Sequence, residues 1–150
     1  MNDVPEKMDE FFNTRADVYD VQHVKNIDGG EKCYHEIARY IPSDAKTLLD
    51  LGCGTGLELE SILKKLSSVK VTCIDMASKM LKKLAEKYSG YSINLINDNY
   101  LVADLGVQKY DVAVSIMSFH HLTHPSKLKL YSNIFQCLKT NGIFIECDYM

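Results

Sequence analysis

The sequence predicts an α/β fold, with five parallel strands in a doubly wound open sheet and helices on both faces. Short apolar runs alternate with stretches whose apolar residues recur at helical spacing, as in right-handed β-α-β crossovers. The first strand-like run leads directly into a glycine-rich loop at 52–56. The 150 residues are 46% hydrophobic and 25% charged, which suits one folded core.

The first half of the chain predicts a helix, a strand and a second helix. Apolar residues at 33, 34, 37, 38 and 41 have helical spacing, and Pro42 ends that segment. Residues 47–51 (TLLDL) form a nearly continuous apolar run, as expected for a parallel strand buried on both faces. After the glycines, apolar residues at 59, 62, 63 and 66 predict an amphipathic helix.

The second half repeats the alternation. Residues 69–75, 91–96, 110–117 and 143–147 are rich in β-prone residues and predict the other four strands. A helical stripe runs from 77 to 88, and apolar residues at 128, 131, 134, 135 and 138 predict one more helix. Ligands of such sheets bind at the carboxyl ends of the strands, so the site is expected there.

Composition narrows the class of protein. No apolar run approaches the ~18 residues that cross a bilayer, and the charged first residues lack a signal-peptide core, so we expect a cytoplasmic protein that does not enter membranes. A net charge of −3 gives no overall reason to bind nucleic acid. The five cysteines form an odd set without a C-x-x-C pair, so we expect reduced, mostly buried thiols rather than a disulfide framework or a zinc site.

The glycine loop has competing interpretations. Gly52, Gly54 and Gly56 let the backbone turn sharply and approach a ligand. The dinucleotide fingerprint G-x-G-x-x-G needs a small residue at its last position, but that position is Leu57 when counted from Gly52 and Leu59 when counted from Gly54. This disfavours NAD as the ligand and leaves an NAD-binding dehydrogenase domain as a remote alternative. No Gly-Lys-Ser/Thr occurs, which disfavours nucleoside triphosphates.

The string D-L-G-C-G-T-G at 50–56 resembles motif I of the class I S-adenosylmethionine (SAM) dependent methyltransferases of small-molecule type. The resemblance extends from about residue 10 to residue 148. Residues 110–115 resemble the family's fourth-strand motif, and 138–145 its L-K-P-G-G motif, with Thr140 and Asn141 in place of Pro-Gly. It implies a Rossmann-like sheet in the order 3-2-1-4-5, SAM as cofactor and S-adenosylhomocysteine as product.

The resemblance also implies the cofactor residues. Asp75 stands where the family binds the ribose hydroxyls, and a carboxylate can accept two hydrogen bonds from a cis-diol; Asp75 also suits a helix N-cap. Asp98 stands where the family binds the adenine amino group, with a solvated loop acid as the alternative. Cys53 is interpreted as packing rather than as a nucleophile. The expected cofactor residues are Tyr19, Asp50, Gly52, Cys53, Gly54, Gly56, Asp75, Met76, Asp98, Asn99 and Ser115.

The acceptor side is less defined. Methyl transfer is an in-line displacement that needs positioning and exclusion of water, and a general base only if the acceptor is protonated. His120 and His121 lie in a segment that resembles the H-H-L of small-molecule members; structural hydrogen bonds are the alternative. His124 extends this to H-H-x-x-H, but partner carboxylates or cysteines are missing, so no metal is expected. The catalytic residue and the acceptor atom stay open.

Two expectations concern the ends of the chain. Residues 1–30 resemble a lid that folds over the cofactor, with Gly29-Gly30 as a joint, and 31–150 form the SAM-binding domain. The family's C-terminal antiparallel hairpin is missing, so strand 143–147 would be an uncovered edge. We therefore expect either a longer enzyme or a second copy that covers this edge. The function predicted is methyl transfer to a small molecule, with a SAM-binding module or fragment without turnover as the alternative.

The lysines of the 77–88 helix, at 79, 82, 83 and 87, fall opposite its apolar stripe. We interpret them as an ordinary solvated face rather than as a nucleic-acid-binding stripe.

Overall fold

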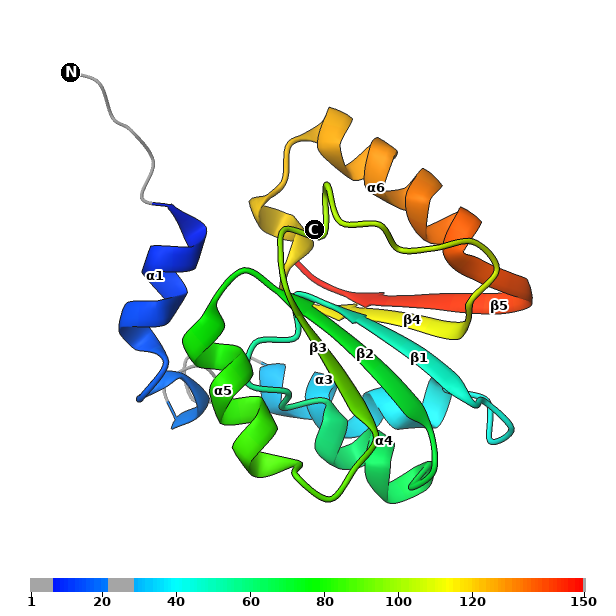
Figure 1. Cartoon of the computed structure of the whole chain (residues 1–150), viewed down its shortest axis with the longest axis horizontal. Coiled ribbons are helices and arrows are strands. Elements are labelled where there is room, and N and C mark those ends of the chain that lie inside the picture. The colour runs from blue at the N-terminus through cyan, green and yellow to red at the C-terminus, as the bar shows by residue number, and fades with distance from the viewer. Residues whose placement is uncertain (1–6, 22–28, 150) are drawn as a thin grey trace.

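The computed structural model describes residues 7–21 and 29–149 and contains a five-stranded parallel sheet (Figure 1). The strands are β1 Thr47–Leu51, β2 Lys70–Asp75, β3 Ile93–Asn97, β4 Tyr110–Ile116 and β5 Leu138–Cys147. Their order is β3-β2-β1-β4-β5, and every neighbouring pair is parallel. The predicted fold class and strand order are therefore confirmed.

Helices cover both faces of the sheet, as expected. Helices α3, α4 and α5 lie on one face and α6 on the other, while α1 lies beside α5 (Figure 1). The α-helices are α1 Met8–Arg15, α3 Gly30–Glu36, α4 Leu59–Lys65, α5 Ser78–Lys87 and α6 His124–Cys137. Two 3₁₀ helices, η1 Ile37–Tyr40 and η2 Phe119–His121, also lie within the described residues.

Strand β1 is the centre of the core because both of its faces are buried. Leu48 packs into the cluster under α3, α4 and α5, whereas Leu49 and Leu51 pack into the cluster under α6. All three side chains are fully buried, which explains why the strand reads as an unbroken apolar run. The predicted bounds of β1 match the structure residue for residue.

The ends of two predicted elements differ from the structure. The helix expected to run up to Pro42 turns into 3₁₀ geometry for its last turn, Ile37–Tyr40. Strand β5 begins at Leu138, five residues before the predicted start, because the turn residues are absorbed as an irregularity in its pairing with β4. Tyr110 pairs with Leu138 and Val112 with Ile143, and Asn141 in between has a φ of 65°.

The apolar face predicted for α6 was wrong in part. Leu128 and Phe135 are 66% and 80% exposed, and the residues that pack on the sheet are Leu130, Ile134 and Cys137. The apolar side chains of this helix spread over a wider arc than the stripe that faces the sheet, so periodicity did not decide which of them are buried.

The prediction that all five cysteines are reduced was also wrong. Cys33 of α3 and Cys147 at the end of β5 form a disulfide across 114 residues of sequence. Strand order brings these two distant segments together, which no spacing rule in the sequence shows. Cys53, Cys73 and Cys137 are free, buried thiols as expected.

Within residues 7–21 and 29–149, no helix is long and apolar enough to cross a membrane. The cytoplasmic location stays a prediction. Residues 1–6 and 22–28, which belong to the predicted lid, lie outside the described residues, so the boundary at residue 30 also stays a prediction.

Strand β5 lies at one end of the strand order, with β4 as its neighbour. Its central residues are apolar and β-branched or aromatic, a composition that favours pairing along a free edge. We propose that a second copy of the chain, or a further segment of a longer enzyme, covers this edge.

We therefore predict that the 150-residue chain self-associates, because the exposed N–H and C=O groups of β5 can pair with those of another copy. Light scattering across a concentration series should give a mass above the 17.0 kDa of one chain. A particle that stays at one chain's mass at every concentration and is fully active would contradict the proposal.

Candidate functional site

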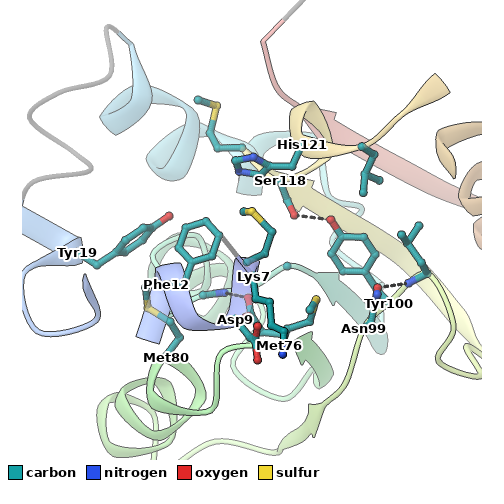
Figure 2. Close-up of a pocket in the computed structure, with 17 residues that line it drawn as sticks. Lys7, Asp9, Phe12, Tyr19, Met76, Met80, Asn99, Tyr100, Ser118 and His121 are labelled. Atoms are coloured by element: carbon teal, nitrogen blue, oxygen red, sulfur yellow. Dashed lines mark hydrogen bonds between the residues drawn. The ribbon is translucent and has the colours of Figure 1, made fainter. Parts of the chain in front are cut away.

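A cavity of about 470 Å³ lies at the carboxyl ends of the strands, where the sequence predicted the site. The segments after β1, β2, β3 and β4 form its walls, and α1 closes one side. In Figure 2, Phe12 of α1 and Tyr100 beyond β3 lie on opposite sides, with His121 and Ser118 between them above.

The glycine loop after β1 forms the floor of the cavity. Gly52, Gly54 and Gly56 have φ values of 71°, 53° and 75°, a region that residues with a Cβ seldom adopt. At Gly52 the space is closed as well, because a Cβ there would lie 2.2 Å from Oγ of Ser118. The Gly52 N–H donates to the carbonyl of Ile74 at 2.8 Å, which ties the loop to the end of β2.

Asp75, at the end of β2, presents a carboxylate to the cavity. One oxygen accepts the N–H of Gly54 and the other that of Ala77, both at 2.8 Å. Burial raises the pKa of Asp75, and these N–H donors offset part of that increase. Each oxygen retains a further acceptor position for a ligand hydroxyl. The N-cap of α5 is Ala77, so the capping role considered for Asp75 was wrong.

Three polar contacts dock the N-terminal segment on α5 at intervals of four residues. The side-chain oxygen of Asn13 accepts the N–H of Lys79 at 3.0 Å, Asp17 pairs with Lys83 at 3.2 Å, and Asp20 pairs with Lys87 at 2.9 Å. Asp20 also accepts a hydrogen bond from the Thr55 hydroxyl of the glycine loop. Three of the lysines interpreted as a solvated face therefore contact the N-terminal segment, Lys79 through its backbone N–H and Lys83 and Lys87 through their side chains.

This docking places apolar side chains over the cavity. Phe12 and Met8 of α1 line it, together with Met76 after β2, Met80 of α5 and Met117 after β4. Four of the six methionines of the chain therefore contact one cavity. Methionine side chains are flexible and polarisable, so these walls can adapt to a bound aromatic or aliphatic group.

Tyr19 and Tyr100 provide two phenol groups in these walls. Burial raises the pKa of both, so both stay protonated at neutral pH. The Tyr100 hydroxyl lies 2.9 Å from Oγ of Ser118, which connects the segment after β3 to the segment after β4 (Figure 2).

His121 lines the cavity, whereas its neighbour His120 does not. Burial lowers the pKa of His121, and the adjacent His120 lowers it further. His121 is therefore neutral at neutral pH and able to accept a proton. Its ring makes an edge contact with Phe12, with centroids 6.0 Å apart.

A buried pair of acids lies behind the glycine loop. Asp50 is fully buried, and Glu58 is 3% exposed. No N–H or O–H among the described residues reaches the Asp50 oxygens, so the neighbouring Glu58 carboxylate is the group that can satisfy a protonated Asp50. Burial, followed by the charge of Glu58, raises the pKa of Asp50 and keeps it protonated.

The structure brings about half of the predicted site residues to the cavity. Those that line it are Tyr19, Gly52, Gly54, Asp75, Met76, Asn99 and His121. Those that do not line it are Asp50, Cys53, Gly56, Asp98, Ser115 and His120.

The residues that do not line the cavity have other contacts. The Ser115 hydroxyl donates to the carbonyl of Leu51 at 3.0 Å between β4 and β1. Asp98 is exposed, and its side chain accepts the N–H of Asn99 at 2.7 Å. Cys53 packs in the core, as the packing interpretation expected. The assigned cofactor roles of these residues stay predictions.

Sequence reasoning missed several members of the site. Met117 directly follows β4 and Tyr100 lies three residues after the end of β3, and that position near a strand end was the available signal. Asp148 also directly follows a strand, β5, but its role depends on a contact with the distant His120. Glu58 gave no such signal, because its importance depends on the contact with Asp50. Within the described parts of the chain, no cluster of three His, Cys, Asp or Glu side chains could hold a metal ion.

A parallel sheet in the order 3-2-1-4-5 with a glycine-floored cavity at its carboxyl edge defines a Rossmann-like methyltransferase fold. The chain belongs to the methyltransferase domain family, which matches residues 48–142, more than half of its length. This membership agrees with the resemblance to class I SAM-dependent enzymes that motif I indicated.

Comparison with individual proteins extends this result. The carboxy-S-adenosyl-L-methionine synthase of Nautilia profundicola is 30% identical over 115 residues, 75% of this chain and 48% of that protein. The malonyl-(acyl-carrier protein) O-methyltransferase of Anoxybacillus flavithermus is 27% identical over 120 residues, 80% of this chain and 44% of that protein. The chain thus spans about half the length of these curated relatives.

A solved structure shows the same fold. Phosphoethanolamine N-methyltransferase 1 of Haemonchus contortus, in complex with phosphoethanolamine and S-adenosylhomocysteine, superimposes with a TM-score of 0.77. The match covers 91% of this chain and 30% of that one at 14% identity, so it supports the fold alone.

The geometry at Gly52 gives a prediction. Gly52→Ala should lower the free energy of unfolding by about 2–4 kcal/mol, because it adds a left-handed backbone penalty to a clash with Ser118. Thermal unfolding measures this loss. Ser118→Gly, which removes the clashing atoms, should restore part of it in the double variant.

Gly90→Ala is the matched control, since a Cβ there meets nothing within 4 Å. If Gly52→Ala and Gly90→Ala lower the free energy of unfolding equally, the contact between the glycine loop and Ser118 is unimportant.

Proposed function

We propose that this chain binds SAM in the cavity and transfers its methyl group to a small-molecule acceptor. The observation that carries the proposal is the combination of the Gly52–Gly54 floor with the Asp75 carboxylate at the next strand end. Family membership supports SAM over NAD as the cofactor.

The residues present fit this cofactor. Asp75 would hold the ribose hydroxyls with the acceptor positions that its two N–H donors leave open. Met76, Tyr100 and Leu101 offer apolar surface for an adenine ring, and Asn99 lies beside them. The bare backbone at Gly54 leaves room for the methionine part, because a Cβ there would meet only the Tyr19 ring, at 3.9 Å.

SAM supplies a methyl group on a positively charged sulfur, and the chain's residues position and shield the reaction. Met8 and Phe12 close the cavity from α1, which excludes water from the displacement. Neutral His121 can take a proton from an acceptor that is protonated at neutral pH, such as an amine or a phenol. A carboxylate acceptor would need no base, and Lys7 at the cavity wall could pair with it.

A SAM-binding module without turnover is the alternative, and the half-length match to the curated relatives is the observation that favours it. We propose the enzyme because the cavity holds a proton acceptor, His121, in addition to the cofactor residues.

We predict that calorimetry will show saturable binding of both SAM and S-adenosylhomocysteine. Asp75→Ala should weaken both about tenfold to a hundredfold, since it removes charge-assisted hydrogen bonds worth roughly 1.5–3 kcal/mol. Asp44→Ala is the control, because Asp44 is an exposed carboxylate in the turn before β1, at the opposite edge of the sheet. Tight binding of NAD without binding of SAM would refute the assignment.

Turnover is tested separately by release of S-adenosylhomocysteine with pools of amines, thiols, phenols and carboxylates. If the acceptor is protonated, His121→Asn should reduce kcat about a hundredfold or more, since general bases contribute typically 10²–10⁴-fold. If it is a carboxylate, Lys7→Ala should raise KM while His121→Asn has little effect. Tight cofactor binding without turnover on any pool would favour the binding module.

A further inference from the structure

Asp148, the first residue after β5, holds His120 with both carboxylate oxygens. One accepts the backbone N–H of His120 at 2.9 Å, and the other lies 2.6 Å from Nδ1 of its ring. The Asp148 side chain is only 6% exposed, and that of His120 is 27% exposed. Because an ionised carboxylate accepts but does not donate, Nδ1 of His120 must carry a proton. Asp148 therefore fixes both the tautomer and the plane of this ring.

His120 transmits that constraint to His121. The two rings are in contact, with centroids 3.9 Å apart and planes tilted by 44°. Tyr149 packs edge-on against His120 at 5.3 Å, which further fixes the ring. Phe12 meets His121 from the cavity side. His121 thus lies between a ring held by Asp148 and the aromatic wall of the cavity.

We propose that Asp148 is a positioning residue that acts through His120 to fix the orientation and proton affinity of His121 at the acceptor end of the cavity. The catalytic role of this arrangement rests on the proposed function. The effect of Asp148 and His120 on His121 does not depend on that function, because it is a property of the three side chains alone. It adds a contribution from the end of β5 to a site otherwise built from the first four strands and α1.

The charges around His121 determine the direction in which its pKa should change when a neighbour is replaced. Partial burial opposes ionisation of Asp148, but hydrogen bonds from Tyr149 and His120 outweigh it and lower the pKa of Asp148, so it is ionised. A negative Asp148 favours protonated His121, whereas a positive His120 disfavours it. The other ionisable groups in the cavity walls are Lys7 just before α1, Asp9 of α1, Asp75 of β2, and the phenols Tyr19 and Tyr100.

Histidine titration by NMR tests the coupling without a known acceptor. The His121 signal is assigned by its loss in His121→Asn. Asp148→Asn should lower the His121 midpoint and His120→Asn should raise it, because Asp148 favours protonated His121 and His120 disfavours it. Glu146→Gln is the control, since Glu146 is an exposed carboxylate on the same strand whose bond goes to Tyr131, and it should leave the midpoint unchanged.

Opposite shifts of the His121 midpoint in the two variants support the proposed coupling of Asp148 to His121 through His120. Unchanged midpoints, or shifts of the same sign in both variants, overturn it. If Asp148→Asn does not fold, as judged by circular dichroism, the His120→Asn shift decides alone. Calorimetry with S-adenosylhomocysteine separates the two proposals. If the wild-type protein shows the coupling of Asp148 to His121 but binds no S-adenosylhomocysteine, the proposed function is refuted and the coupling is not. Where turnover is found, the acid limb of its pH profile should move with the His121 midpoint.

Discussion

The contact between Gly52 and Ser118 is the constraint on which the site depends. The turn after β1 can approach the segment after β4 because Gly52 has no side chain and adopts a positive φ. The same residue is bonded to the end of β2, so three strand ends converge within one turn. Tyr100 then extends the connection to β3 through its contact with Ser118. The cavity is therefore a consequence of how closely these ends can pack.

Behind this contact lies an electrostatic arrangement that stabilises the loop from beneath. Two buried carboxyl groups can coexist because burial raises the pKa of both, and a protonated Asp50 can donate to Glu58. The positive charge of Lys87 acts on Glu58, while the same ammonium pairs with Asp20 of the N-terminal segment. One lysine thus connects the buried acids, α5 and the segment that covers the cavity. Exposed ion pairs contribute little individually, so the apolar contacts of Phe12 and Met8 supply most of the docking energy.

The features that the sequence predicted correctly are those that depend on residues close together in the chain. The buried strand TLLDL and the glycine loop were identified because a both-face-buried strand and a positive-φ turn restrict composition strongly. The buried face of α6 could not be predicted, since apolar residues such as Leu128 and Phe135 lie on its exposed side. The Cys33–Cys147 disulfide and the hold of Asp148 on His120 depend on strand order and end-to-end packing. Such contacts exist only after the chain has folded.

The neutrality of His121 suits the chemistry that the fold supports. In the proposed reaction the sulfonium of SAM is positive, and a second positive charge beside it in an apolar cavity would be repelled strongly because the local dielectric is low. Burial among Phe12 and the cavity methionines keeps His121 uncharged, so it can face the reacting centre without that repulsion. The negative charge of Asp148 lies one ring further away, behind His120. His121, a base with low proton affinity, lies in the cavity wall, and the Asp148 carboxylate lies outside it. Together they allow His121 to accept a proton without placing a permanent charge next to the methyl position.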